Sequence, residues 1–200
     1  MKNIDPNQFI DKVIVALRKA AVNLEEFQVK TALGKAEAKD KYEEVKKEFN
    51  SFIHDSEYKI KEVKENIEDL KAKFDELHIQ LVLGKAETID AFKKQKKQLL
   101  ITLHEIEVKI KNNKALNRIY AVTLIEIEQF KIKLEILEKK YQNEKKETKS
   151  SFQRGKKEFN SFIDKITAKY SKKKEESKLE HFQKEINEAF SHFKKAFSNS

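Results

Sequence analysis

The residues best suited to bind a metal ion lie near the end of the chain. His181, Glu185, Glu188 and His192 follow one another at steps of four, three and four residues. In a helix these steps place all four side chains on one face, where imidazole and carboxylate groups can hold a divalent cation. The same pattern is typical of the solvated face of any amphipathic helix. We expect a solvated face, and keep the four residues as a candidate metal site.

A second pair of histidines carries less chemistry. His54 and His104 occupy matching positions in a repeated sequence, and each precedes an acid, Asp55 and Glu105. Adjacent residues point to different faces of a helix, so neither pair forms a ligand set by itself. The sequence also shows no nucleophile with a general base and no glycine-rich phosphate loop. We therefore predict a protein that is not an enzyme, with no cofactor and no small-molecule substrate.

Charge is concentrated in one part of the chain. Residues 139–174 contain thirteen lysines and arginines against four acids, and so carry the whole formal net charge of +9. Such a window can attract a polyanion, although lysine-rich helix faces are commonly just solvated. The candidate polyanion-binding residues are Lys145, Lys149, Arg154, Lys156, Lys157, Lys172, Lys173 and Lys174.

These residues are embedded in an internal repeat. The pentapeptide LGKAE at 33–37 returns unchanged at 83–87, and the octapeptide KKEFNSFI at 46–53 returns at 156–163. Three units, at about 21–70, 71–120 and 131–180, share a period of roughly 50–60 residues. The chain is therefore built from copies of one unit.

The repeats have the composition and periodicity of helices. The sequence is 38% charged and has three glycines and one proline, a composition typical of long helices or coiled coils. Apolar residues recur at steps of three and four, and acids often precede lysines by four residues, as helices favour. Between Leu100 and Leu137 apolar and charged residues partly alternate, which leaves a β-hairpin as an alternative. We favour a denser apolar helix there, covered by neighbours on more than one side.

Turn-prone residues suggest where the helices end. They occur at Asp55–Ser56, at Asn112–Asn113 and from Ser171 to Ser177. We predict helices at about 6–54, 57–111, 115–170 and 177–198, the first with Asp5 as N-cap and Pro6 at its first position. The predicted fold is all-α: a single domain, 1–200, forming an elongated antiparallel three-helix bundle or coiled coil with a short C-terminal amphipathic helix.

Gly34 and Gly84 lie near the middle of two of these predicted helices. The alternative is that each glycine ends a helix. We favour the mid-helix position, because the following Lys-Ala-Glu is a good helix former without a capping residue beside the glycine. A glycine inside a helix costs about 1 kcal/mol against alanine, so its repetition suggests a close approach of helices or a bend.

The last predicted helix has a strongly apolar face, formed by Phe182, Ile186, Phe190, Phe193 and Phe197. We expect this face to dock onto the bundle; pairing with another chain or lying in a membrane surface are alternatives. The chain has no cysteine, and its apolar stretch near residues 9–17 is too short and too charged for a signal peptide or a membrane span. We expect a cytoplasmic protein.

The repeated pattern Leu-Gly-Lys-Ala-Glu-x-x-Asp-x-Tyr/Phe, at 33–42 and 83–92, resembles that of small bacterial coiled-coil stress-response proteins. Their chains close with an amphipathic segment similar to the one at 190–197. The chain differs from the acidic balance expected of that family and lacks tryptophan. The resemblance implies a non-enzymatic, stress-associated helical protein.

We therefore predict a structural or interaction protein, acting as a scaffold, that binds a protein partner or itself. The alternative is a protein that binds nucleic acid or anionic membrane weakly, and without reading sequence, through the basic third repeat.

Overall fold

The computed structural model describes residues 6–30, 35–61, 68–83, 86–112, 116–142, 145–170 and 179–198. Within these ranges the chain forms seven α-helices and no strand, so the all-α prediction is confirmed and the β-hairpin alternative is wrong. None of the described helices is long and apolar enough to cross a membrane. The helices are α1 (Pro6–Lys30), α2 (Lys35–Lys61), α3 (Glu68–Val82), α4 (Ile89–Lys111), α5 (Asn117–Tyr141), α6 (Lys145–Tyr170) and α7 (Leu179–Ser198).

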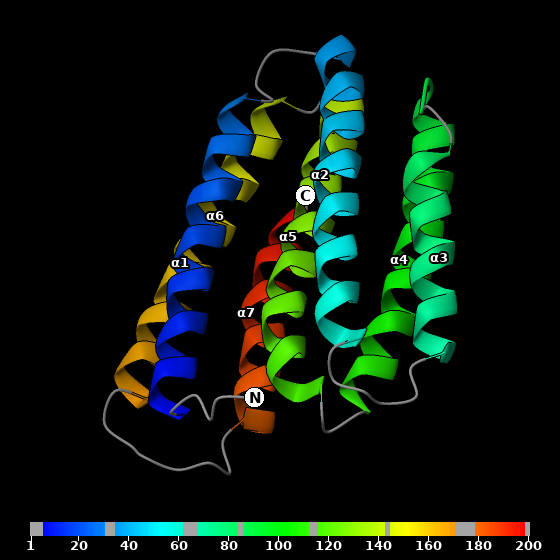
Figure 1. The fold of residues 1–200 in the computed structure, drawn as a ribbon. Helices are drawn as coiled ribbons and strands as arrows, with labels where there is room; N and C mark the ends of the chain where they lie inside the picture. Colours follow the sequence, from blue (N-terminus) through cyan, green and yellow to red (C-terminus); the bar gives the residue numbers. More distant parts are fainter. Residues whose placement is uncertain are drawn as a thin grey trace.

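Successive helices run in opposite directions and surround α5 (Figure 1). On one side α5, α1, α6 and α7 form a ring in which each helix contacts the next. On the other side α5, α2, α3 and α4 form a second ring of the same kind. The fold is therefore two four-helix rings that share α5, with one continuous hydrophobic core.

The shared helix α5 is buried on all sides. Its apolar residues from Ala121 to Tyr141 are almost all buried, and so are polar residues such as Thr123, Glu128 and Gln129. A helix that contacts α1, α2, α4, α6 and α7 has no wide solvated face, so its apolar residues do not follow a single stripe. This burial explains the partial alternation in the sequence, and confirms the interpretation of a dense helix with several neighbours.

The lengths of the helices differ from the prediction. Asp55 and Ser56 lie inside α2, where Ser56 is buried, so the turn predicted there is wrong. The predicted helices 57–111 and 115–170 are each two helices, the second pair separated after Gln142. Helix α4 does end at the predicted turn, with Asn112 as its C-cap. Residues 171–177 lie outside the described residues. Within the described residues, six shorter helices replace the three long ones, and each of them packs on at least two neighbours.

The mid-helix prediction for the two glycines falls on Gly34 and Gly84, which lie outside the described residues. Near Gly84, the described residues show that α3 ends at Val82 and that α4 begins only at Ile89. The signal that we overlooked is Thr88, whose hydroxyl accepts a hydrogen bond from the backbone N–H of Ala91 at 3.1 Å and so caps α4. This cap lies four residues beyond Gly84, not beside it.

A close approach of two helices occurs at Gly155. A Cβ atom on Gly155 would lie 3.2 Å from the ring and from the backbone oxygen of Phe193. Gly155 is on α6 and Phe193 on α7, so the missing side chain lets these helices pack closely. Phe190 and Phe193 are buried, and α7 packs on α6 and α5 as expected for a docked helix.

We expect Gly155→Leu to destabilise the protein by roughly 1–3 kcal/mol, because overpacking against Phe193 outweighs the gain in helix propensity. The measurement is the urea midpoint of unfolding. Gln153→Leu, at an exposed position of the same helix, is the control and should change the midpoint little. A higher midpoint for Gly155→Leu would show that α6 and α7 do not approach closely here.

A buried tyrosine predicts alkaline sensitivity. Burial, with Glu43 and Asp40 nearby, raises the pKa of Tyr141 to about 12, and its hydroxyl donates to the backbone oxygen of Ala86 at 3.0 Å. Because the unfolded tyrosine ionises near about pH 10, the folded state holds more protons above that pH. Stability should therefore fall between about pH 10 and 12, by up to about 1.4 kcal/mol per pH unit from this residue. Tyr141→Phe should make the fall less steep in urea titrations, and an unchanged slope would contradict this.

Candidate functional site

A shallow surface groove runs along the outer face of α4. Lys93, Lys97, Leu100, Ile101 and His104 line it, and its volume is about 570 Å³. Lys93, Lys97, Leu100 and His104 follow at steps of four, three and four, and Ile101 lies four residues after Lys97. The five residues thus form a second stripe on α4, beside the buried stripe that includes Phe92, Leu99, Leu103 and Ile106. We call this feature the α4 groove. The sequence analysis did not identify it, although the second stripe of α4 is visible in the sequence and could have indicated it.

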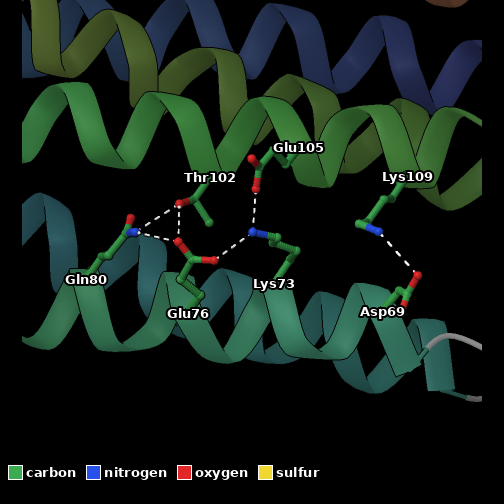
Figure 2. Close-up of polar contacts among 7 residues, drawn as sticks. All are labelled: Asp69, Lys73, Glu76, Gln80, Thr102, Glu105 and Lys109. Atoms are coloured by element: carbon green, nitrogen blue, oxygen red, sulfur yellow. Dashed lines mark hydrogen bonds and ion pairs between the residues drawn. The ribbon is translucent and has the colours of Figure 1, made fainter.

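Ion pairs fix α4 against α3 (Figure 2). The ammonium group of Lys73 on α3 lies 2.8 Å from Glu76 of the same helix and 2.5 Å from Glu105 of α4. Hydrogen bonds to Glu105 and Glu76 raise the pKa of Lys73. Further along the two helices, Lys109 pairs with Asp69 at 3.5 Å. Because Glu105 also borders the α4 groove, these contacts set one edge of it.

A buried hydroxyl completes the contact between α3 and α4. Thr102 is buried, and its hydroxyl donates to Glu76 at 3.2 Å and accepts from the Gln80 amide at 2.9 Å (Figure 2). Gln80 also donates to Glu76 at 3.2 Å. The hydrogen bond from Lys73 is the main cause that lowers the pKa of Glu76, so its carboxylate stays ionised and keeps accepting these bonds.

Ion pairs also fix α4 against α5 on its other side. Lys96 is almost buried and lies 2.7 Å from Glu135 and 2.6 Å from Glu138, both on α5. Toward the other end of the same interface, Lys131 of α5 pairs with Glu107 of α4 at 2.7 Å. Helix α4 is thus held at several heights by two neighbours, and the α4 groove lies on the face that remains.

The same network continues into the other ring. Lys131 also lies 2.9 Å from Glu128, and Glu128 lies 2.5 Å from Lys194 of α7. Burial alone would lower the pKa of Lys131, but the carboxylates of Glu128 and Glu107 raise it above its usual value. The chain of charges from Glu107 to Lys194 therefore joins α4, α5 and α7 through buried groups that compensate one another.

The exposed part of the α4 groove combines apolar and cationic groups. Ile101 is 51% exposed, Val108 further along the same face is 42% exposed, and Lys93, Lys97 and His104 are exposed. An apolar surface with lysines at one end suits a helix that carries apolar and acidic residues. The groove therefore presents apolar side chains beside lysine side chains.

The structure divides the polyanion-binding candidates. Arg154 donates to the backbone oxygen of Ala196 at 3.1 Å, and Lys156 pairs with Glu25 of α1 at 2.5 Å. Lys157 is exposed and, with Arg154 and Lys165, lines a groove of about 610 Å³ between α6 and α7. The side chains of the remaining candidates, Lys145, Lys149, Lys172, Lys173 and Lys174, lie outside the described residues.

The repeated lysine pair shows why Lys156 is only partly exposed. Lys46, Lys96 and Lys156 hold the same position in the three repeats, each followed by a second lysine that is exposed. Lys46 is buried and pairs with Glu43 at 3.1 Å, Lys96 pairs with α5, and Lys156 pairs with α1. The first lysine of each pair is thus a structural cation. Comparing the repeats in the sequence cannot show this role, because the acidic partners of these lysines are known only from the structure.

The metal-site candidates do not come together. Glu185 forms an ion pair with Lys169, and His192 Nδ1 lies 3.8 Å from Glu158 on α6. Glu188 is exposed, and the side chain of His181 lies outside the described residues. In the part of the chain that the structure describes, no group of three or more histidines and acids is placed to hold a metal ion.

The repeated histidines are also separated. The ring centre of His54 lies 6.3 Å from that of His78. The Nδ1 atom of His78 forms a hydrogen bond with Oδ1 of Asn50 at 2.6 Å. His104 instead lines the α4 groove. The equivalence of His54 and His104 in the sequence therefore brings no shared site.

Comparisons with protein-family models, with curated proteins and with solved structures found no match. The function is therefore argued from the geometry of the chain, and the resemblance to coiled-coil stress-response proteins stays a prediction.

Proposed function

We propose that this protein is a non-enzymatic interaction protein that acts as a rigid helical scaffold and binds an acidic amphipathic helix of a partner protein in the α4 groove. The observation that carries the proposal is the exposed stripe of Lys93, Lys97, Leu100, Ile101 and His104 on a helix whose other faces are fixed by ion pairs. The cysteine-free sequence supports a cytoplasmic site of action.

The stripe matches the way one helix recognises another. An amphipathic partner helix presents apolar residues at steps of three and four, which can pack on Leu100 and Ile101. Acidic residues at one end of that helix would then meet Lys93 and Lys97. Lys96, beneath the groove, already pairs with Glu135 and Glu138, and Lys93 lies 4.0 Å from Glu138. Lys97 therefore supplies most of the attraction.

The support for a scaffold comes from pre-organisation. The contacts of α4 with Lys73 and Gln80 of α3 and with Lys131 of α5 hold it before a partner arrives. A binding surface that is already ordered loses less conformational entropy on association. A single groove of this size still suits a transient partner better than a permanent one.

The test uses a synthetic helical peptide with leucines at steps of three and four and glutamates on its flanks. Fluorescence anisotropy should detect binding by the wild-type protein at low salt. Lys97→Glu and Ile101→Asp should each weaken the affinity at least about tenfold, because they remove the attractive charge and the apolar contact respectively.

Two controls make the test specific. Lys157→Glu makes the same charge change on α6 and should leave the affinity unchanged, and a scrambled peptide of the same charge should bind poorly. Circular dichroism checks that the variants stay folded. If Lys157→Glu weakens the affinity as much as Lys97→Glu, or if the scrambled peptide binds equally well, the peptide is attracted nonspecifically to a basic protein. Either result would contradict binding in the α4 groove.

The same position can identify the natural partner. A photo-reactive amino acid in place of Ile101 should crosslink a discrete protein in extracts of the source cells, and Lys97→Glu should abolish the product. The same amino acid in place of Tyr58, exposed on α2, is the matched control.

The second candidate function is binding of a polyanion, nucleic acid or anionic membrane, by the third repeat. The observation that favours it is the groove in which Arg154, Lys157 and Lys165 lie together with His192. Glu158 lies in the same groove and lowers its net charge, so we expect weak binding with a steep salt dependence.

Heparin affinity chromatography tests the second candidate. The double variant Lys157→Glu with Lys165→Glu should elute at clearly lower salt than the wild type, because each lost phosphate or sulfate contact reduces counterion release. Lys97→Glu is the charge-matched control. If both variants shift elution equally, the retention reflects net charge alone; if the wild type is not retained at low salt, the polyanion proposal fails.

A further inference from the structure

The outer face of α1 carries an apolar stripe that the bundle leaves uncovered. Val15, Val22 and Val29 follow one another at steps of seven residues and are 65%, 52% and 62% exposed. The opposite face of α1, with Leu17 and Leu24, is buried against α5 and α6. Steps of seven keep residues on nearly one line of a helix, so the three valines lie in a row, two turns apart, here called the valine stripe.

The charges beside the valine stripe are ordered by sign. Arg18 and Lys19 lie before Val22, and Glu25 and Glu26 lie after it. At about 3.6 residues per turn, Lys19 and Glu26 fall on one side of the stripe, while Arg18 and Glu25 fall on the other. On each side of the stripe, therefore, a cation lies about one turn before Val22 and an acid lies about one turn after it.

We propose that the valine stripe pairs with the valine stripe of a second copy of this chain, antiparallel, about a two-fold axis at Val22. Such an axis places Val22 against Val22 of the second copy and Val15 against Val29. It also places Lys19 beside Glu26, and Arg18 beside Glu25, of the other copy. The surface is self-complementary in shape and in charge, as an isologous interface requires.

The same charges disfavour the parallel arrangement. A two-fold axis parallel to α1 would place Arg18 against Lys19 of the second copy, and Glu25 against Glu26. Like charges facing each other are destabilising, so the order of signs selects the antiparallel pairing.

Contacts within one copy hold three of these charges in place, and one of them is Glu26, which lies 3.6 Å from Lys30 of its own helix. Arg18 pairs with Asp164 at 3.1 Å and Glu25 pairs with Lys156 at 2.5 Å, and both partners belong to α6. Each of these side chains stays partly exposed, so it can still contact the second copy. Lys19 and Glu26 are exposed and supply the pairs on the other side of the stripe.

One helix face buries less surface than the roughly 1,600 Å² of a standard interface, so we expect a weak dimer with a Kd in the range of about 10 μM to 1 mM. Sedimentation velocity over a concentration series should show the monomer converting to a dimer. Val22→Glu should weaken dimerisation at least about tenfold, because it places two carboxylates at the two-fold axis. Val108→Glu, the same change on α4, should leave it unchanged.

Charge reversal tests the pairing. Lys19→Glu and Glu26→Lys should each weaken the dimer, and the double variant should restore it, because the reversed pairs again carry opposite charges. Double-mutant restoration distinguishes this contact from an effect of net charge.

Single-cysteine variants determine the orientation, because the chain has no native cysteine. Under mild oxidation Val22→Cys should form a disulfide-linked dimer rapidly, and Val15→Cys alone should not. The double variant Val15→Cys with Val29→Cys should crosslink as fast as Val22→Cys. Val108→Cys gives the rate of chance collisions. A protein that stays monomeric at about 1 mM, or equal crosslinking of Val15→Cys and Val22→Cys, would overturn the proposal.

Discussion

The burial of α5 on all sides is the constraint on which the rest of the structure depends. A helix surrounded by five others needs apolar residues around its whole circumference, and α5 supplies them from Ala121 to Tyr141. Because two rings share this one helix, neither ring has a complete core without it. The other helices need only one wide apolar face each, which leaves their outer faces to carry charge and function.

The polar groups buried around α5 are satisfied by ion pairs between helices. Lys96 meets two carboxylates of α5, and Lys131 meets one carboxylate of α4 and one of its own helix. Such pairs add little net stability compared with apolar residues of the same size, but breaking one leaves an uncompensated charge. They therefore act mainly to fix how α4, α5 and α7 lie against one another, and so hold the α4 groove in shape.

The two proposed binding surfaces lie in different rings. The valine stripe belongs to α1 in the ring with α6 and α7, and the α4 groove belongs to the ring with α2 and α3 (Figure 1). A dimer built on α1 would leave both α4 grooves open. Two linked grooves bind a partner with two sites more tightly than either groove alone, without any new contact. Weak self-association and weak groove binding would then reinforce each other.

The sequence by itself determined the helical class, the repeat, the end of α4 at Asn112 and the dense character of α5, because apolar spacing and composition report local structure directly. It also held the signal for the start of α4, because Thr88 caps this helix through Ala91, three residues on. It did not separate Lys156 from Lys157, two adjacent lysines of which only the first meets Glu25. Gly155 likewise gained its role from Phe193 on another helix. Only the tertiary structure decided these points, because each depends on a neighbour far away in the chain.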